Sequence, residues 1–270
     1  MFNQIVVHTI LLISSACMIV PFVWMVSTSL KYPDEIFVFP PRWIPRNPTL
    51  ENYTELFKSM NFGRPFLNTI IVAGCITFFS ILISSMAGYA FAKFRFKGRD
   101  RLFFMVLATL MVPGQMTLIP VFLLMRYLGL LNTYTGLIVP GIASSFNIFF
   151  MRQFIYTIPN DLIEAARIDG AKEGYIFFKI ILPLSKPAIT TIAIFTFTGS
   201  WNSFLWPLII AQDERMYTLP VAVSVLAGQY VENIAIQMAG SCVVITPILA
   251  FFLFAQRHFI KGISLTGLKG

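Results

Sequence analysis

A short stretch of charged and small residues interrupts this apolar chain at positions 163–187, where the sequence reads IEAARIDGAKEGYIFFKIILPLSKP. The pattern predicts two short helices, one over 162–169 and one over 172–182, the second ending at Pro183. Gly170 falls between them, and glycine there allows the positive φ that turns a chain after a helix. Two helices joined in this way can form a rigid knob that docks in a groove of a soluble partner. From the residues alone, a loop that rests on the bilayer surface is an equal alternative.

The sequence offers no recognisable catalytic or metal centre. It lacks the G-x-x-x-x-G-K-[ST] phosphate loop and the H-E-x-x-H zinc motif, and it has only two histidines. No serine falls into an obvious arrangement with a base. Cys17, Cys75 and Cys242 all lie in long apolar runs, which argues against a disulfide framework. We therefore expect no catalytic residue, metal or cofactor in this chain, and the energy for any work must come from another subunit.

The composition indicates that the chain lies in a membrane, so membrane helices must position these residues. The chain has 270 residues, of which 57% are hydrophobic and 12% charged, against about 25% charged residues in an average soluble domain. Because backbone groups in lipid must be paired within the protein, long apolar runs predict an all-α membrane protein. We expect six membrane-spanning helices, over about 5–30, 65–92, 102–125, 136–151, 188–211 and 233–255.

The distribution of basic residues predicts the orientation. Thirteen of the twenty lysines and arginines fall in the loops after the second and fourth runs and near the C-terminus. Since an excess of these residues marks the cytoplasmic side, we expect both termini, the loop 157–187 and the tail 259–270 to be cytoplasmic. The proline-rich segment 31–64 then lies outside, with a short helix starting near Thr49. The formal charge of +8 is thus a topology signal, and no nucleic-acid partner is expected.

The charged stretch resembles the cytoplasmic EAA loop of binding-protein-dependent ABC importer permeases. The pattern E-A-A-x3-G-x9-I-x-L-P is reproduced in full by Glu164, Ala165, Ala166, Gly170, Ile180, Leu182 and Pro183. The segments PRNPTLENYTELF, AGYAFAKFRFKGR and GSWNSFLWPLII and the ending TGLKG are similar to the carbohydrate subclass, in particular to maltose-type G-subunit permeases. The resemblance therefore extends over nearly the whole chain.

The resemblance implies a single permease domain over 1–270 with the type I ABC importer permease fold, in a bacterial cytoplasmic (inner) membrane. It assigns the motif residues to contact with a cytoplasmic ATPase, whose closure on ATP and Mg would rock the spanning helices between inward- and outward-facing states. The implied partners are a second homologous permease, two ATPase subunits, an extracytoplasmic solute-binding protein, the lipid bilayer and a sugar. The tail 261–270 is expected to reach between the ATPase subunits as an extended peptide.

A run that reads TFTGSWNSFLW is a candidate sugar path in such a permease. Uncharged hydrogen-bonding groups beside aromatic faces suit sugars, which present hydroxyls on their edges and C–H bonds on their faces. The candidates are Trp201, Asn202 and Ser203, together with Gln115, which follows a Pro-Gly break in an earlier run. The alternative is that these polar groups only bridge helices, as serine, threonine and asparagine often do in membranes.

Two other functions stay open at this point. A glycerol-phosphate importer permease would resemble this chain nearly as well, although a phosphate favours a basic residue along the path and the predicted spans contain none. A self-sufficient secondary carrier or channel is the alternative from another class. Ion-driven carriers commonly place ionisable residues at mid-membrane, and no predicted span holds Lys, Arg, Asp or Glu. Backbone and hydroxyl oxygens can also bind a coupling ion, so this absence does not decide the matter.

Overall fold

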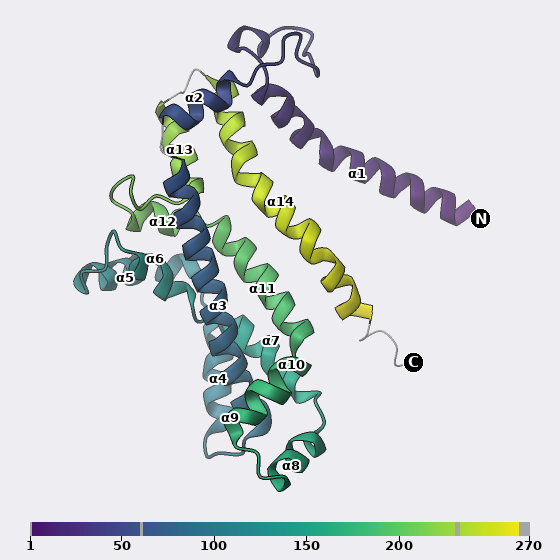
Figure 1. The fold of residues 1–270 in the computed structure, drawn as a ribbon, viewed down its shortest axis with the longest axis vertical. Helices are drawn as coiled ribbons and strands as arrows, with labels where there is room; N and C mark the ends of the chain where they lie inside the picture. The colour runs from purple at the N-terminus through teal and green to yellow at the C-terminus, as the bar shows by residue number, and fades with distance from the viewer. Residues whose placement is uncertain (1, 60–61, 230–232, 265–270) are drawn as a thin grey trace. The chain divides into compact units, whose positions relative to one another are not determined.

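The protein is helical throughout the part of the chain that the structure describes. The computed structural model describes residues 2–59, 62–229 and 233–264, and these residues include no strand. The chain divides into two compact units, the first formed by Met1–Pro65 and Leu219–Leu249 and the second by Phe66–Thr218 and Ala250–Gly270. Figure 1 shows the helices in chain order, from α1 at the N-terminus to α14.

The first unit contains the long N-terminal helix, the segment that follows it and two C-terminal helices. Its elements are α1 (Phe2–Ser29), η1 (Pro33–Glu35), α2 (Glu51–Ser59), α13 (Leu219–Gln229) and the first part of α14 (Ile234–Ser264). Helix α2 starts as the sequence predicts, because the Thr49 hydroxyl accepts a hydrogen bond from the Glu51 amide at 3.1 Å. Helix α13 was not expected from the sequence.

A buried lysine organises the proline-rich segment after α1. Lys31 is fully buried, and its ammonium donates a hydrogen bond to the Arg42 carbonyl at 2.5 Å. The same ammonium lies 4.2 Å from the centroid of the Trp24 ring, which packs edge-on against Trp43. Burial lowers the pKa of Lys31, and the nearby Glu35 opposes that shift. Apart from η1, this segment has no regular structure before α2, as its prolines predict.

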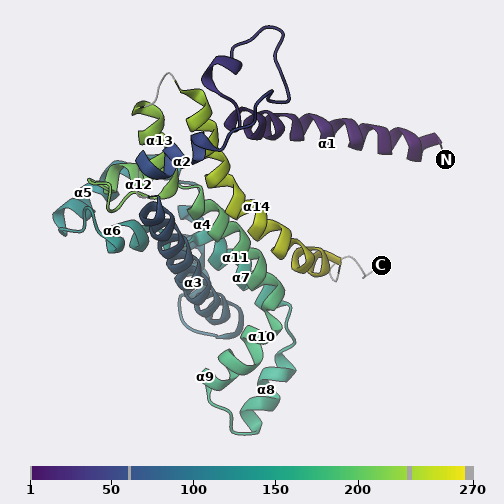
Figure 2. The same cartoon turned by 45° about the horizontal axis from the view of Figure 1, so that its top comes forward.

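The second unit contains the remaining helices, among them the predicted knob, which is the helix pair formed by α8 and by the run α9–η3–α10. Its elements are α3 (Gly63–Lys93), α4 (Arg99–Thr109), α5 (Gly114–Tyr127), α6 (Tyr134–Ile138), η2 (Val139–Gly141), α7 (Ser145–Tyr156), α8 (Asn160–Ile168), α9 (Glu173–Ile176), the π-helical turn η3 (Phe177–Ile181), α10 (Leu182–Leu184), α11 (Lys186–Trp201) and α12 (Leu205–Ile210). Helices α8 and α9 lie at one end of this unit, where α3 ends and α4 begins, as the views in Figures 1 and 2 agree.

Three long helices and two bent pairs among the described residues match five of the six apolar runs, whereas the third bent pair joins α9–α10 of the knob to α11. Gln4–Ser29, Gly63–Lys93 and Ile234–Leu253 are each long and apolar enough to cross a bilayer. The other candidates are pairs whose axes differ by 98° between α4 and α5, 46° between α6–η2 and α7, and 76° between α9–α10 and α11. The continuous helices predicted over 102–125 and 136–151 are therefore wrong in detail, and the number of membrane crossings stays a prediction.

Proline and glycine account for two of these breaks. Helix α5 begins directly after Pro113, whose ring removes a backbone donor and whose ψ of 130° leaves the helical region. The Pro140-Gly141 pair lies in η2, and α7 then restarts behind Ser144, whose hydroxyl accepts a hydrogen bond from the Asn147 amide at 3.3 Å. In the fifth run, α11 ends at Trp201 and a separate helix, α12, follows after a three-residue break.

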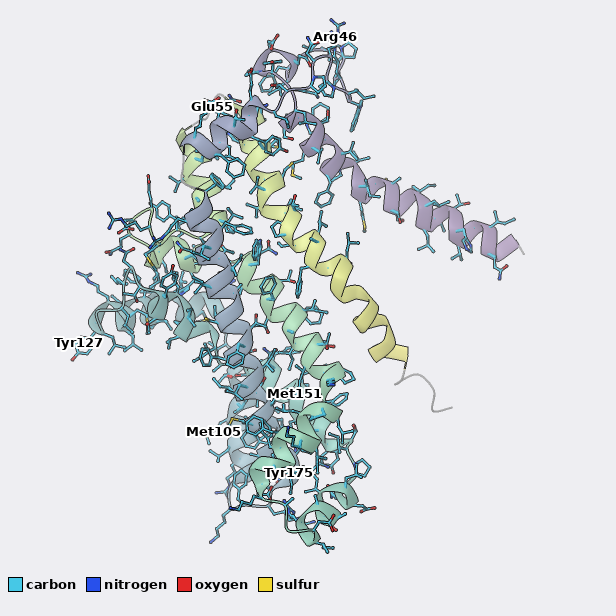
Figure 3. The ribbon with its side chains drawn as sticks, in the orientation of Figure 1. Arg46, Glu55, Met105, Tyr127, Met151 and Tyr175 are labelled. Carbon is cyan, nitrogen blue, oxygen red and sulfur yellow. The ribbon has the colours of Figure 1, made fainter. Side chains whose placement is uncertain are left out.

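The core of the second unit joins the knob to helices α3, α7 and α11. It is formed by buried apolar residues from α3, α7, η3, the knob helices and α11, namely Tyr89, Ala92, Met151, Ile155, Ile158, Ile163, Ile176, Phe177, Ile181, Ala188 and Ile192. A Cβ on Gly88 would lie 2.8 Å from the Met151 Cβ and 2.9 Å from the Arg152 amide nitrogen, so α3 and α7 approach almost backbone to backbone. Figure 3 labels Met151 within this bundle and Tyr175 at its end.

The C-terminal tail departs from its prediction. An extended peptide was expected over 261–270, but α14 continues to Ser264. The helix therefore includes the first four of these residues, and positions 265–270 lie outside the described residues.

Candidate functional site

Gly170 forms the turn between the two knob helices. Its φ is +81°, which confirms the left-handed conformation that the sequence predicts there. The Gly170 amide donates to the Arg167 carbonyl at 3.0 Å, and the Ala171 amide donates to the Ala166 carbonyl at 2.9 Å. These two bonds close the end of α8 in the way that helices ending at a glycine commonly do. No atom lies within 4 Å of a Cβ built at Gly170, so the requirement for glycine is conformational and not a matter of space.

The second knob helix continues past the proline that was expected to end it. A helix over 172–182 ending at Pro183 is wrong, because the chain stays helical through Leu184. A π-helical turn precedes the proline, and in it the Leu182 amide bonds to the Phe177 carbonyl, five residues back. We attribute this wider turn to Pro183, which cannot donate the hydrogen bond of an ordinary helical turn.

The knob buries one face and exposes the other. Ile163, Ile176 and Ile181 are buried in the core of the second unit. The predicted contact residues lie further out: Glu164, Ala165, Gly170 and Pro183 are exposed, whereas Ala166, Ile180 and Leu182 are half-buried. Four motif residues are therefore exposed on the knob, whereas Ala166, Ile180 and Leu182 pack against the core that also holds the buried isoleucines.

Large apolar side chains add to this exposed surface. Ile168 is 86% exposed, Tyr175 59% and Phe178 57%. Exposed apolar groups gathered on one small element are typical of a surface that another molecule covers.

A hydrogen-bonded chain of three side chains links the knob to α3. The Tyr89 hydroxyl on α3 donates to Glu173 Oε2 at 2.9 Å, and Arg167 Nε on α8 donates to Glu173 Oε1 at 2.7 Å. Glu173 at the start of α9 is thus held from both α3 and α8. The Arg167 guanidinium also lies 5.9 Å from the centroid of the Phe94 ring.

Charge stabilises the contact between Arg167 and Glu173. The hydrogen bond from Arg167 lowers the pKa of Glu173, and the bond from Tyr89 adds to that effect. The same contact raises the pKa of Arg167. A depressed carboxyl pKa means that the contact is present at neutral pH and is lost only as the pH falls through that lowered value.

Lys93 provides a second link between α3 and α8. This residue ends α3, and its ammonium donates to the Ile158 carbonyl and to Asn160 Oδ1, the latter at 2.8 Å. Sequence reasoning did not identify Tyr89, Lys93, Arg167 or Glu173 as parts of the site. The available signal was weak, since it consisted of a tyrosine and a lysine at the end of an apolar run and an oppositely charged pair on either side of Gly170.

A cavity of about 520 Å³ lies within the second unit, and most of its lining is apolar. Its walls come from α3, α5, α6, η2, α7, α11 and α12, and the side chains that line it are uncharged. Polar groups on its wall include Thr117, Asn147, Thr196, Ser200 and Ser203.

Hydrogen bonding differs among these polar groups. The Asn147 side-chain amide donates to Ser80 Oγ at 2.9 Å and to Thr196 Oγ1 at 3.0 Å, which joins α7 to α3 and α11. The buried Ser200 hydroxyl has no hydrogen-bond partner within the described part of the chain. A cavity with free hydroxyl capacity and no charge suits a neutral, hydroxyl-rich ligand.

The structure separates the four residues that were predicted for a sugar path. Ser203 lines the cavity. Trp201 is buried and packs against Phe66 and Phe197, with ring centroids 5.9 and 5.6 Å away, and it is not part of the cavity wall. Asn202 is exposed and donates to the Thr198 carbonyl at 3.1 Å.

Gln115 is also exposed and lies next to Gly114, which does line the cavity. The cavity therefore brings together Ser203 with residues of α5 and α7, and it leaves the other three predicted side chains off its wall. Within the described residues, no cluster of three or more His, Cys, Asp or Glu side chains could hold a metal ion.

The sequence of this chain is similar to those of known transport proteins. Residues 80–264 match the family described as binding-protein-dependent transport system inner membrane component. The arabinooligosaccharides transport system permease protein of Halalkalibacterium halodurans is 42% identical to this chain, over 84% of the chain and 81% of that protein. The lactose transport system permease protein of Rhizobium radiobacter is 35% identical, over 96% and 94%.

A solved structure matches as well. A chain of a bacterial ABC transporter involved in the import of the acidic polysaccharide alginate superimposes with a TM-score of 0.84 at 26% identity, covering 96% of both chains. The helical architecture of the described residues is therefore that of an ABC importer permease. By its sequence and its fold, this chain belongs to the family of inner membrane components of binding-protein-dependent transport systems.

Proposed function

We propose that this chain is the membrane-spanning permease subunit of an ATP-driven importer for sugars or oligosaccharides in a bacterial cytoplasmic membrane. It would act with a second homologous permease, two cytoplasmic ATPase subunits that bind ATP and Mg, and an extracytoplasmic solute-binding protein. Six membrane crossings and two cytoplasmic termini fit the distribution of basic residues, the three long helices, the two bent pairs α4–α5 and α6–α7, and helix α11.

The knob is proposed as the element that couples ATP hydrolysis to transport. The observation that carries this proposal is the exposed motif on a rigidly attached helix pair. Glu164 and Ala165 face outward, the left-handed Gly170 sets the angle between the helices, and Glu173 ties the pair to α3. A push on the knob is therefore transmitted to a long helix and is not absorbed by a flexible loop. Ala166, Ile180, Leu182 and Pro183 complete the contact surface.

The uncharged cavity supports a neutral substrate. A phosphorylated substrate such as glycerol phosphate would favour a cation near its binding site, and the residues that line the cavity include none. Hydroxyls at Ser200 and Ser203 and the indole of Trp206 offer the mixed surface that sugars bind. The two similar permeases named above are described as transporting arabinooligosaccharides and lactose. We therefore propose a neutral sugar or short oligosaccharide.

Copurification and reconstitution test this function against a self-sufficient carrier. The tagged chain, solubilised from its native membrane, should bring with it an ATPase and a second permease of related sequence. In proteoliposomes, the assembled complex with its solute-binding protein should take up sugar only when ATP is supplied on the knob side. Uptake by the chain alone, driven by an ion gradient and without ATP, would show that it is a secondary carrier.

A further inference from the structure

A second, larger cavity lies where α3 ends and α4 begins. It has a volume of about 1030 Å³, and the join between α7 and α8 completes its wall. Its charged lining consists of Lys93, Arg95, Lys97, Arg99, Arg101 and Asp100, a net charge of +4. Arg99 and Asp100 pair with each other at 2.9 Å. No ion pair within the described residues involves Arg95, Lys97 or Arg101, so three cations around this cavity have no carboxylate partner.

The backbone adds to this positive potential. Helix α4 has eleven residues and begins at Arg99, directly after Gly98, whose φ is +85°. The first-turn amides of a helix have no partner inside it, and the helix dipole makes this end attractive to anions. The cavity therefore combines a helix N-terminus with cationic side chains, which is the arrangement that binds phosphate groups in many proteins. Orientation in the membrane explains why a loop is basic, but it does not require the basic residues to surround a cavity.

Apolar side chains lie beside the cationic ones. Phe96 at the cavity is 42% exposed. The next two turns of α4 expose Leu102, Phe104 and Met105, at 45%, 70% and 56%, and Figure 3 labels Met105 on this helix. A soluble anion would use only the cations. A molecule with an anionic head and long apolar tails would use both surfaces.

We propose that this cavity binds the phosphate headgroup of an anionic phospholipid, whose acyl chains lie along α4. Lys97 and Arg101 bind the phosphate, together with the backbone amides of Asp100 and Arg101 in the first turn of α4. Because the same cavity includes Lys93 and Asn160, which join α3 to α8, a bound lipid contacts the support of the knob. The orientation of this cavity toward the cytoplasmic side rests on the proposed function, but lipid binding itself is independent of what the protein transports.

The test measures lipid retention by the solubilised complex. The assembled importer is incubated in nanodiscs that contain equal amounts of phosphatidylglycerol and phosphatidylcholine, released, and analysed by native mass spectrometry. A Lys97→Gln/Arg101→Gln variant is compared with Lys58→Gln/Arg126→Gln, which removes the same charge from exposed residues outside the cavity. Each cation near a membrane surface contributes roughly a fivefold effect, so retained phosphatidylglycerol should fall by tenfold or more in the cavity variant only. A Lys97→Arg/Arg101→Lys variant should restore it, which excludes misfolding as the cause.

Each other outcome overturns the proposal. Equal retention by the two neutralised variants would mean that the basic residues act only as topology signals. Displacement of phosphatidylglycerol by inorganic phosphate in the mixed nanodisc would assign the site to a soluble anion. Loss of the ATPase from the cavity variant with unchanged lipid would make the cavity a protein interface. Sugar uptake is measured separately, so a failure of lipid binding leaves the proposed transport function intact.

Discussion

The Tyr89 hydroxyl donates a hydrogen bond to Glu173 across 2.9 Å, joining the end of α3 to the knob over 84 positions of the sequence. Glu173 is also held by Arg167, so its carboxylate receives one hydrogen bond from a long helix and one from α8. A knob held only by apolar contacts could shift relative to α3, because such contacts have no preferred direction. The directional hydrogen bond at the start of α9 opposes that shift. The bond is therefore a specific point at which coupling can be weakened without touching the exposed motif.

Tyr89→Phe should uncouple hydrolysis from transport. The change removes one hydrogen bond to a carboxylate, worth about 1–3 kcal/mol, and leaves the ring in its core position. We expect normal assembly and basal ATP hydrolysis, with severalfold less sugar imported per ATP in proteoliposomes. Tyr127→Phe, on a side chain that is 88% exposed, is the control. An unchanged ratio of uptake to hydrolysis in Tyr89→Phe would show that the bond does not transmit force.

Gly170→Ala should impair coupling, whereas Gly174→Ala should not. A Cβ would have open space at both positions, but only Gly170 has a positive φ. Left-handed backbone costs an ordinary residue roughly 1–2 kcal/mol, so the first change should shift the angle between α8 and α9. The measurement is ATP hydrolysis stimulated by the solute-binding protein and sugar, with Gly170→Val as a stronger version. Equal stimulation in the alanine variants would mean that the turn angle is unimportant.

Glu164→Lys should weaken the contact with the ATPase. The side chain is exposed on α8, and a reversed charge in a charged interface can cost several kcal/mol. We expect the ATPase to be lost or depleted on copurification, while the chain still inserts into the membrane. Glu55→Lys, an exposed reversal on α2 that Figure 3 labels, should retain the ATPase. Full retention and full uptake in Glu164→Lys would remove the main support for the proposed role of the knob.

Substitutions around the cavity should separate packing from substrate contact. Ser203→Ala should lower the rate of uptake severalfold with normal assembly, because Ser203 lines the cavity. Trp201→Ala should instead reduce assembly, since truncation of a fully packed tryptophan costs about 3–5 kcal/mol. Asn202→Ala should have a small effect. The measurements are initial uptake rates and the yield of assembled complex, and normal uptake in Ser203→Ala would exclude a contact with sugar at this position.

Single cysteines should report the orientation of the chain. In a background that lacks Cys17, Cys75 and Cys242, Pro45→Cys should react with an impermeant thiol reagent applied to whole cells, and Leu265→Cys should be protected. Labelling of both positions after the membrane is made permeable is the control. The reverse pattern in intact cells would invert the assignment of the two faces.

Local features of the site followed from the sequence. The positive φ of Gly170 was predictable because it depends on a few neighbouring residues and on the steric cost of a Cβ. The long helices followed from apolar length alone. The contact between Tyr89 and Glu173 was not predictable, because it depends on the rotation of α3 about its axis and on where α9 packs.

The residues of the cavity show the same limit. Helical periodicity would have placed Trp201, Asn202 and Ser203 on different faces of one continuous helix. The structure ends α11 at Trp201, so the directions of the next two side chains are set by a break that single-sequence reasoning did not locate. Thr196 and Ser200 belong to the same TFTGSWNSFLW run and also line the cavity.

The close approach at Gly88 has a mechanical consequence. Where α3 and α7 meet nearly backbone to backbone, the two helices can tilt about the contact but have little room to slide past each other. Tyr89, which donates a hydrogen bond to Glu173 of the knob, is the next residue on α3. Asn147, which lines the uncharged cavity, lies one turn from Met151 on α7. The contact between α3 and α7 thus lies between the knob and the cavity, and it can act as the pivot between them. A larger residue at Gly88 would force α3 and α7 apart and loosen their contact. In the proposed mechanism, a movement of the knob would then produce a smaller movement of the helices around the cavity.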